Sequence, residues 1–340
     1  MKILHVITSS NFGGAEQYLL HLIKEQKRKG HEIYLYRHPF EKRDDEAAAV
    51  ADRDVMTRVF NSISPVHLAR ICRFIHREGV HVIHTHLAKA SILGGIAGLL
   101  CRKPVIATVH GMNTGKDYRF STALIAVSRA VKEYLLQKGG CSKPVHVIHS
   151  GIPDPGTQKR EFLKEGTLRL LFAGRLSREK GIDLLIPRLA SCCDIPWTLT
   201  VAGEGSMKEE LLALSRRFQV EERIRFTGFV PHMGPLFLGH DCLVLPSRKE
   251  AFGLVIIEAF AHGMPVLAAA TGGTTEIITP ESGGILYDSS SDTSFNVALK
   301  QLFNGENLIR MGRQAYGSYR RRFTLEIMTE QVMEVYGQYL

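Results

Sequence analysis

Short apolar runs alternate with amphipathic stretches along almost the whole chain. Apolar runs bounded by polar residues predict buried strands, and apolar positions that recur every three or four residues predict helices. In the first half, the predicted strands are residues 3–8, 33–36, 82–85, 105–108, 123–127 and 145–148. The helices predicted between them are residues 15–29, 66–78, 89–100 and 129–137, the last capped by Ser128. This alternation predicts a parallel, doubly wound sheet.

The alternation of apolar runs and amphipathic stretches is interrupted at residues 150–166. These residues are rich in Gly, Pro and charged side chains and therefore predict a linker. The alternation restarts with predicted strands at residues 168–173, 198–202, 224–227, 242–245, 266–269 and 285–287. The predicted helices are residues 183–190, 207–218, 255–262, 295–303, 309–319 and 325–340. We therefore expect two α/β domains in tandem, with a ligand site between them, beyond the carboxyl ends of the strands.

Composition agrees with a globular protein of this kind. The length of 340 residues suits two domains of about 150–170 residues each. The longest apolar run, residues 91–100, is about half as long as a membrane span, and the first residues lack the apolar core of a signal peptide. The six cysteines form no Cys-x-x-Cys pair, so we expect reduced thiols in a cytoplasmic protein. They are Cys72, Cys101, Cys141, Cys192, Cys193 and Cys242.

The net charge of +9 is unevenly distributed. Residues 1–165 contain 25 Lys and Arg against 15 Asp and Glu, whereas residues 166–340 contain 18 against 19. This excess indicates attraction to an anionic acceptor or membrane surface, or simply a solvated surface. Arg70, Arg73 and Arg77 share one face of a predicted helix, which suits either an interfacial helix or a solvated one. Aromatic residues are not interleaved with the basic ones, so nucleic acid is not an expected partner.

The strongest candidate for chemistry is the segment from Ser247 to Glu258. A predicted strand ends before it, Glu250 lies in its loop, Gly253 permits close approach of the backbone, and Glu258 follows on a predicted helix. The start of that helix offers unpaired N–H groups and a partial positive charge, which suit a diphosphate. Glu250 can then accept hydrogen bonds from sugar hydroxyls, and Glu258 from ribose hydroxyls. Alternatively both are ordinary surface charges, but a Glu in so apolar a helix needs a partner.

A second candidate, residues 172–181, also links a predicted strand to a predicted helix. Gly174 and Gly181 permit a tight turn around a ligand. Arg175 and Lys180 are two cations that can neutralise the charge on a leaving diphosphate. The pattern alone is weak evidence, and its position after the first strand of the second half strengthens it.

Smaller signals follow other predicted strands. The glycine clusters at residues 11–16, 203–205 and 271–276 each indicate a turn, and the first lacks the GxGxxG spacing of dinucleotide-binding dehydrogenases. His84 and His86 have no third metal ligand at a known spacing, so we expect structural roles for them. His110 precedes a glycine at the end of a predicted strand, where it can bind a sugar hydroxyl or serve a structural role.

Taken in their order along the chain, these motifs resemble those of the retaining glycosyltransferases of family 4. Members of that family have the GT-B fold, in which two Rossmann-like doubly wound domains face a central cleft. The resemblance covers nearly the whole chain, and its specificity comes from the order of the motifs. These are Gly13-Gly14-Ala15-Glu16, residues 81–86, Val109-His110-Gly111, Gly174-Arg175-Leu176 with Lys180-Gly181, Gly203-Glu204-Gly205, Phe226-Thr227-Gly228-Phe229-Val230, the Glu250/Glu258 pair and Gly263-Met264-Pro265-Val266.

The resemblance implies an N-terminal acceptor domain over residues 1–150 and a linker over residues 151–166. A nucleotide-sugar-binding domain would span residues 167–322, and a helix over residues 323–340 would cross back to the first domain. The implied catalytic residues, which would hold the diphosphate or the transferred sugar, are Glu250, Arg175, Lys180 and His110. The implied donor-binding residues are Gly13, Gly14, Gly174, Gly205, Phe229, Val230, Ala251, Phe252, Gly253, Leu254 and Glu258.

The implied reaction is metal-independent transfer of a hexose-type sugar, with retention, from a nucleotide-diphosphate donor such as a UDP-sugar. No cofactor is implied. The acceptor would be a hydroxyl of a glycolipid or polysaccharide precursor, such as lipopolysaccharide core, reached in the cytoplasm or at the anionic inner face of its membrane. The alternatives are a nucleotide-sugar epimerase or hydrolase of the same fold, or a non-catalytic nucleotide-sugar-binding subunit.

Two features depart from this pattern, and a third sequence matches a motif of other glycosyltransferases. Relatives commonly carry Asn-Gly-Ile/Val-Asp where this chain has Ser150-Gly151-Ile152-Pro153, and a Pro where it has Thr274-Thr275. These changes affect linker geometry and donor selection rather than the diphosphate-binding set. The sequence Asp52-Arg53-Asp54 matches the motif with which other glycosyltransferases hold a divalent metal. It lies in a polar, predicted helical stretch and follows no apolar strand, so we interpret it as chance.

Overall fold

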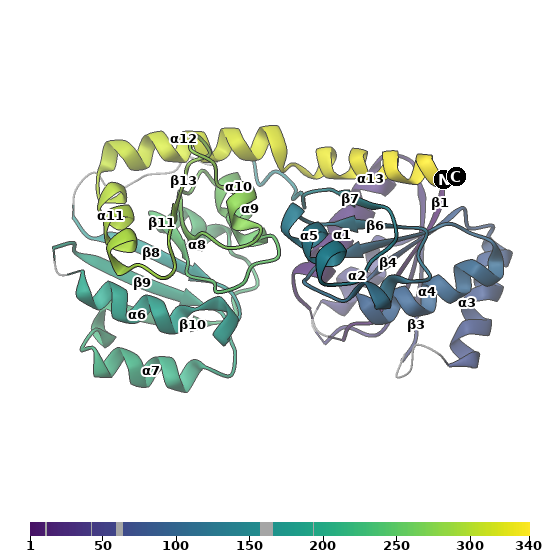
Figure 1. Ribbon diagram of the computed structural model, residues 1–340, viewed down its shortest axis with the longest axis horizontal. Coiled ribbons are helices and arrows are strands. Elements are labelled where there is room, and N and C mark those ends of the chain that lie inside the picture. The colour runs from purple at the N-terminus through teal and green to yellow at the C-terminus, as the bar shows by residue number, and fades with distance from the viewer. Residues whose placement is uncertain (11, 42, 59–63, 157–165, 193) are drawn as a thin grey trace. The chain divides into compact units, whose positions relative to one another are not determined.

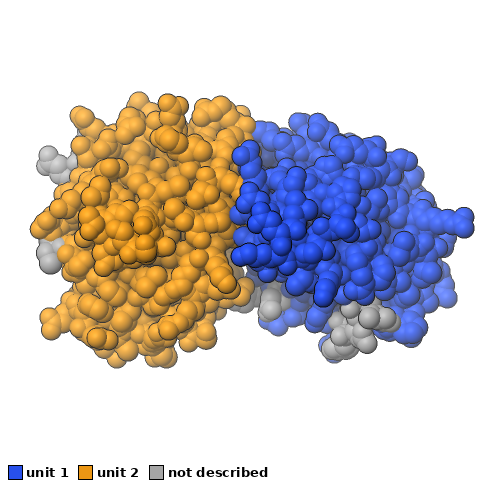
Figure 2. Space-filling view, in the orientation of Figure 1, with its two compact units in different colours: residues 1–153, 324–340 blue, residues 154–323 orange. Residues whose placement is uncertain are grey.

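The computed structural model of the chain (Figure 1) describes residues 1–10, 12–41, 43–58, 64–156, 166–192 and 194–340. The chain divides into two compact units (Figure 2). Unit 1 is Met1–Pro153 together with Thr324–Leu340, and unit 2 is Asp154–Phe323. Each unit has its own parallel β-sheet and its own buried apolar core.

Unit 1 is built on seven parallel strands in the order β3-β2-β1-β4-β5-β6-β7. Side chains alternate between two cores along β1, because Ile3 and Ile7 belong to one buried cluster and Leu4 and Val6 to the other. A strand buried on both faces is a continuous apolar run, which explains why the sequence predicted most of these strands. Their bounds are β1 (Lys2–Ile7), β2 (Glu32–Arg37), β3 (Arg53–Met56), β4 (Val82–His86), β5 (Val105–Val109), β6 (Ala123–Ala126) and β7 (Val145–Val147).

Helices cover both faces of this sheet. One buried cluster includes residues of α1 (Gly14–Arg28) and α13 (Leu325–Tyr339), and the other includes residues of α3 (Pro65–Glu78) and α4 (Ala88–Cys101). Unit 1 also contains α2 (Asp44–Val50), α5 (Arg129–Gln137) and the 3₁₀ turn η1 (Gly115–Tyr118). Ser128 Oγ accepts a hydrogen bond from Val131 N at 3.1 Å, which confirms the predicted cap of α5.

Unit 2 has six parallel strands in the order β10-β9-β8-β11-β12-β13. They are β8 (Leu168–Ala173), β9 (Trp197–Ala202), β10 (Ile224–Gly228), β11 (Cys242–Leu245), β12 (Val266–Ala269) and β13 (Gly284–Tyr287). The helices are α6 (Ile182–Ser191), α7 (Lys208–Arg217), α8 (Gly234–Gly239), α9 (Leu254–Ala261), α10 (Thr274–Ile277), α11 (Asp292–Leu302) and α12 (Gly305–Arg322), with 3₁₀ turns η2 (Arg178–Lys180) and η3 (Glu221–Arg223). In both sheets the strand order reverses beside the first strand, as expected for a doubly wound fold.

The segment after α12 returns to unit 1. Ile152 forms an isolated parallel bridge with Thr324, and Leu325 N donates to Ile152 O at 2.9 Å. Gly151 allows this close approach, because a Cβ there would lie 2.3 Å from Thr324 O. Val332 and Tyr336 of α13 then lie in the same buried cluster as Ile3 and Ile33.

The prediction for residues 52–54 was wrong in one respect. Arg53 to Met56 form the edge strand β3 rather than a continuation of the helix before it, since they pair with residues 34–37 of β2. Asp54 binds the buried Arg37 at 2.8 Å, and Asp52 binds Lys27 at 3.1 Å and the backbone N of Ile33 at 2.7 Å. Both carboxylates are thus already engaged within the fold, which agrees with reading the Asp-Arg-Asp sequence as chance.

The described cysteines are all free thiols: Cys72, Cys101, Cys141, Cys192 and Cys242. Cys193 lies outside the described residues. Burial raises the pKa of the Cys101 thiol to about 12, so this thiol stays protonated. None of the helices in the described part of the chain has both the length and the apolar character needed to cross a bilayer.

Candidate active site

The candidate segments of unit 2 follow strands that end at the same edge of its sheet. Because the strands are parallel, the segments after β8, β9, β11 and β12 all leave from their carboxyl ends. Hydrogen bonds join these segments: Arg248 N donates to Glu179 O at 2.8 Å, and Gly273 N donates to Glu250 O at 2.9 Å. Leu176 N likewise donates to Glu204 O at 2.8 Å. Segments far apart in the sequence therefore form one connected group of loops.

The two strongest sequence candidates meet in an ion pair. Lys180 Nζ lies 2.6 Å from Glu250 Oε2, and Ser247 Oγ donates to the same oxygen at 3.2 Å. The Lys180 side chain is 27% exposed and the Glu250 side chain 10%, so the pair is shielded but reachable from solvent. An ammonium group and a carboxylate this close can bind two neighbouring groups of one ligand, one anionic and one rich in hydroxyls.

Two glycines permit this contact. Gly181 has φ +67°, and a Cβ there would lie 2.0 Å from Pro246 O. Gly272 has φ +50°, and its Cβ would lie 2.1 Å from Glu250 O. Any other residue would be strained and would push the loops apart. These glycines therefore hold the backbones of Lys180 and Glu250 at their observed separation.

Arg175 stands apart from this pair. It follows Gly174 in the loop after β8, and its side chain is exposed, with no hydrogen bond or ion pair to the described part of the chain. The structure therefore brings Lys180 and Glu250 together but leaves Arg175 as a separate cation facing solvent. An exposed guanidinium without an acidic partner can bind an anionic ligand at little cost in broken contacts.

Glu258 lies half-buried on α9, the helix that begins directly after the Glu250 loop. Its neighbours Ile257 and Ala259 are fully buried, so Glu258 occupies the more open side of an otherwise apolar helix. Gly253 caps this helix with φ +108°. The other predicted residues at the start of α9 differ in exposure: Phe252 and Gly253 are buried, whereas Ala251 and Leu254 are half-buried.

The remaining unit 2 candidates lie at the ends of β9 and β10. Gly203 N donates to Gly228 O at 2.8 Å, which ties the Gly203–Glu204–Gly205 loop to the segment carrying Phe229. Phe229 is 45% exposed and Val230 is half-buried. An exposed aromatic ring at a strand end can stack against a flat ligand such as a nucleotide base.

In unit 1, the predicted residues lie at the carboxyl ends of β1 and β5. Gly13 N donates to Glu16 Oε2 at 2.8 Å, and Gly14 begins α1. His110 follows β5 and lies edge-on against Tyr18, with 4.9 Å between ring centroids. Burial lowers the pKa of His110 to about 3, so its imidazole is neutral and can bind hydroxyls but does not act as a cation.

His84 and His86 are fully buried, and the structure adds a third histidine that sequence reasoning missed. His5 of β1 lies with them so that one ring nitrogen from each falls within 4.8 Å of the others. His5 and His84 are register partners on adjacent strands. Strand pairing, which the sequence does not reveal, is the only signal that would have found it.

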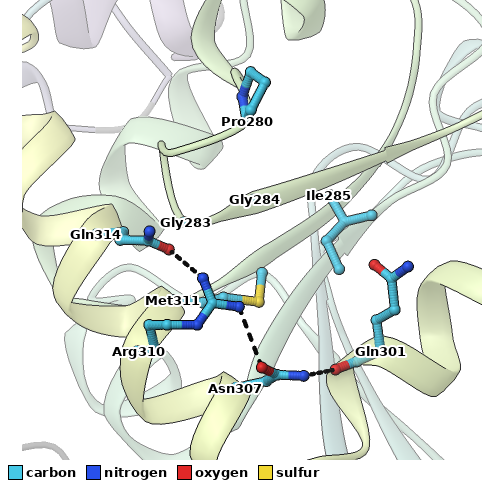
Figure 3. A pocket seen from close by; sticks show the side chains of 9 residues that line it. All are labelled: Pro280, Gly283, Gly284, Ile285, Gln301, Asn307, Arg310, Met311 and Gln314. Atoms are coloured by element: carbon cyan, nitrogen blue, oxygen red, sulfur yellow. Dashed lines mark hydrogen bonds between the residues drawn. The ribbon is translucent and has the colours of Figure 1, made fainter.

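A cavity of about 240 Å³ lies elsewhere on unit 2. Figure 3 shows Arg310 on its wall, between Gln314 at 3.4 Å and Asn307 at 3.2 Å. The cavity also contacts Gly283 and Gly284, at the amino end of β13. It contains none of the predicted site residues, and it lies at the opposite sheet edge from the strand ends that carry them.

Two family models match adjoining parts of the chain. One, described as Glycosyltransferase Family 4, matches residues 12–154, and the other, described as Glycosyl transferases group 1, matches residues 155–321. The chain belongs to glycosyltransferase family 4. The junction between the two matches falls at the first boundary between the structural units of this glycosyltransferase.

Individual relatives agree with this membership. A glycosyltransferase of Methanocaldococcus jannaschii is 29% identical over 62% of this chain, and the match spans 63% of that relative's own length. An Anabaena structure, Alr3699/HepE in complex with UDP and glucose, superposes with a TM-score of 0.84 at 22% identity, covering 99% of this chain and all of that one. The lipopolysaccharide outer core galactosyltransferase WaaB superposes with a TM-score of 0.76 at 18% identity, again over 99% and 100%. At these identities the two structures show that this glycosyltransferase has the GT-B fold.

The glycosyltransferase also contains a brace that the sequence did not indicate. Arg248 donates to both carboxylate oxygens of Asp183, each at 2.7 Å, and these bonds lower the pKa of Asp183. Arg248 Nη1 also donates to Arg178 O at 2.7 Å. Since Arg178 and Asp183 flank Lys180, this bidentate pair fixes the Lys180 turn against the Glu250 loop.

Proposed function

We propose that this glycosyltransferase transfers a hexose-type sugar, with retention and without a metal ion, from a UDP-sugar to a hydroxyl of a glycolipid or polysaccharide precursor. The observation that carries the proposal is the Lys180–Glu250 pair at the strand ends of unit 2. Such a pair suits a sugar diphosphate, in which an anionic phosphate and a polyhydroxylated ring are joined through one anomeric oxygen. UDP is supported by the Anabaena neighbour, which holds UDP and glucose.

In this proposal, Lys180 and Arg175 stabilise negative charge as the diphosphate leaves. An ammonium group has three N–H donors, so Lys180 can keep Glu250 and still donate to a phosphate oxygen. Glu250 accepts from sugar hydroxyls and Glu258 from the ribose, while the backbone near Phe229 and Val230 holds the base. His110, Gly13 and Gly14 approach the transferred sugar. Lys180 and Arg175 together supply the charge stabilisation that other transferases obtain from a bound metal.

Retention is supported by the state of Glu250. Its Oε2 already accepts hydrogen bonds from Lys180 and Ser247, which makes this carboxylate a poor nucleophile toward the anomeric carbon. The acceptor hydroxyl would instead attack from the face that the diphosphate leaves. The departing phosphate would take the acceptor's proton.

The first experiment is incubation of the purified protein with UDP-, GDP- and ADP-sugars in EDTA, with and without membrane extract. We expect release of nucleotide from a UDP-sugar that depends on the extract and persists in EDTA. Release of nucleotide without extract would indicate an epimerase or hydrolase. No release of nucleotide from any donor would indicate a non-catalytic binding subunit. Loss of release in EDTA, restored by Mg²⁺ or Mn²⁺, would contradict the metal-independent mechanism.

A membrane-associated acceptor, such as lipopolysaccharide core, is supported by the surface of unit 1 and by the WaaB neighbour. Arg70, Arg73 and Arg77 are exposed along α3. At the end of α4, Leu99 and Leu100 are 61% and 63% exposed. Exposed cations on α3 together with exposed leucines on α4, which packs against α3, suit the headgroup region of an anionic membrane. The enzyme would then act at the cytoplasmic face of that membrane.

We expect the full-length protein to float with liposomes that contain phosphatidylglycerol but not with phosphatidylcholine alone. Each surface cation contributes about 1 kcal/mol near an anionic bilayer. Replacing Arg70, Arg73 and Arg77 together by Glu should therefore weaken partitioning by on the order of a hundredfold. The matched control reverses three exposed unit 2 charges, Arg216, Arg217 and Arg313. An equal loss of liposome binding in both variants, or flotation that does not depend on lipid charge, would refute a specific membrane-binding face.

A further inference from the structure

A continuous line of hydrogen-bonded side chains runs through unit 1, on the face covered by α1 and α13. His110 Nε2 lies 3.5 Å from His86 Nδ1, and His86 Nε2 lies 3.1 Å from His5 Nδ1. His5 Nε2 in turn lies 2.8 Å from Oε1 of Gln26 on α1. Three side chains, two from strands and one from a helix, are thereby joined to His110, the candidate sugar-binding residue.

The line continues beyond Gln26. Its Nε2 lies 3.3 Å from the hydroxyl of Tyr336 on α13. That hydroxyl contacts His84 Nδ1, and His84 Nε2 lies 2.6 Å from Thr108 Oγ1. The histidine chain, as we call it, consists of His110, His86, His5, Gln26, Tyr336, His84 and Thr108.

All four imidazoles in the histidine chain are neutral. Burial lowers the pKa of His5 to about 4 and that of His110 to about 3, and it holds the pKa of His84 and His86 well below 6.5. A neutral imidazole carries one N–H donor and one bare acceptor nitrogen. Fixing the orientation of one member of the histidine chain therefore fixes the proton position on each ring along it.

Gln26, in the middle of the histidine chain, is that fixed member. Its amide nitrogen lies 3.7 Å from Met333 Sδ, which can only accept, so the amide oxygen must face His5. His5 then carries its proton on Nε2 and accepts on Nδ1. It follows that His86 donates from Nε2 to His5, and His110 donates from Nε2 to His86.

The remaining bonds run in the same sense. Gln26 donates to Tyr336, Tyr336 donates to His84 Nδ1, and His84 donates from Nε2 to Thr108. Every member thus donates to the next, an arrangement in which each bond polarises its neighbours favourably. The consequence concerns His110, the first member of the histidine chain. Its Nδ1 is left as a bare acceptor with no partner in the described part of the chain. This nitrogen is not one of the fully buried polar atoms that lack a partner, so it is open to a ligand.

The same histidines do not form a good metal site. Both nitrogens of His84 already have partners, Tyr336 and Thr108. The rings of His84 and His86 are stacked, with 4.3 Å between centroids and 25° between their planes, so their lone pairs lie in nearly parallel planes. A metal would also require the lone pairs that the histidine chain uses as acceptors.

We propose that the histidine chain holds His110 as its Nε2–H tautomer, so that Nδ1 accepts a hydrogen bond from a hydroxyl of the bound sugar. The functional part of this inference rests on the proposed glycosyl transfer, whereas the tautomer does not. His86, His5 and Gln26 are then positioning residues that act through His110.

The decisive measurement is long-range ¹H–¹⁵N NMR of the full chain with ¹⁵N-labelled histidine at pH 7.5, which distinguishes the two tautomers of each ring. We expect His5, His84, His86 and His110 all to be neutral Nε2–H tautomers. An Nδ1–H form at His110 would reverse the direction of the histidine chain and overturn the proposal. Shifts of the buried histidines on adding Zn²⁺, at one equivalent, would overturn it in favour of a metal site.

The functional arm replaces His86 by Phe, which removes the acceptor that orients His110. We expect a mixed tautomer at His110, and a value of kcat/KM about threefold to tenfold lower for the donor active in the nucleotide-release assay, the usual effect of one lost neutral hydrogen bond. The matched control is His146→Phe, because His146 lies outside the histidine chain and its side chain hydrogen-bonds, among the described residues, only to Tyr339, at 3.1 Å. Unchanged tautomer and unchanged kcat/KM in His86→Phe would refute the positioning role.

If His86→Phe fails to fold, Gln26→Met provides the same test from two rings away. It removes the oxygen that orients His5 and leaves His110 and its neighbour in place. We expect the tautomer at His110 to become mixed here as well, and a single unchanged tautomer would count against the proposal. Absence of transfer by the unaltered protein would refute the proposed function, and the NMR result would stand separately.

Discussion

Replacing Lys180 by alanine is expected to lower turnover of the donor by on the order of a hundredfold or more while the fold survives. Removing one fixed charge contact to a transition state typically costs about 2.7–4 kcal/mol. Lys180 is placed for such a contact, since its Nζ is held 2.6 Å from Glu250 and remains 27% exposed. The effect should fall mainly on kcat, because charge on the diphosphate grows as the glycosidic bond breaks. Initial-rate kinetics would measure it.

Arg178→Ala is the matched control, because Arg178 shares the same 3₁₀ turn. Its side chain is 72% exposed, and its ion pairs with Asp183 and Glu210 are longer, at 3.6 and 3.3 Å. Exposed pairs of this kind contribute about 1 kcal/mol or less, so this variant should stay within a few-fold of the original rate. Turnover in Lys180→Ala within threefold of the unaltered enzyme would refute the assignment of Lys180.

The second large effect is expected for Glu250→Gln. The amide keeps the shape and one acceptor oxygen but loses the charge that binds Lys180 and the strong acceptor for sugar hydroxyls. Hydrogen bonds to charged groups contribute about 1.5–3 kcal/mol, which predicts a fall in kcat/KM of roughly tenfold to a hundredfold. Because those hydroxyl contacts exist before bond cleavage, KM for the donor should rise as well.

Glu210→Gln serves as the control for this variant, since Glu210 lies on α7 with a side chain 56% exposed. Isothermal titration calorimetry with UDP and with the intact UDP-sugar separates the two contributions. Glu250→Gln should weaken binding of the UDP-sugar much more than binding of UDP. Equal weakening of both ligands would indicate that Glu250 acts on the diphosphate and not on the sugar.

The sequence predicted those parts of the fold that are visible as local patterns. Strands such as β8, β11 and β12 are buried on both faces, so each is an apolar run whose bounds match the prediction residue for residue. The strand β3 was missed because it is an edge strand with a polar sequence, stabilised by contact with β2 and by the Arg37–Asp54 pair. The helix α10 has four residues, too few for a helical period to be recognised.

The candidate site shows the same division. Strand ends followed by glycines and charges identified Lys180 and Glu250 separately, but their ion pair joins residues that are 70 positions apart. It depends on β8 and β11 being neighbours in the sheet, and strand order is not encoded in any local pattern. The Arg248–Asp183 brace and the position of His5 beside His84 escaped prediction for the same reason.

The return of α13 to unit 1 affects how the protein can be made. Its residues Val332 and Tyr336 belong to the core formed by the first strands, yet they follow the whole of unit 2 in the chain. A ribosome synthesises residues in order, so unit 2 can fold while the first 153 residues still lack part of their core. We expect unit 1 to mature last, once α13 has been synthesised, and chaperones that bind exposed apolar surface to act on it during that interval.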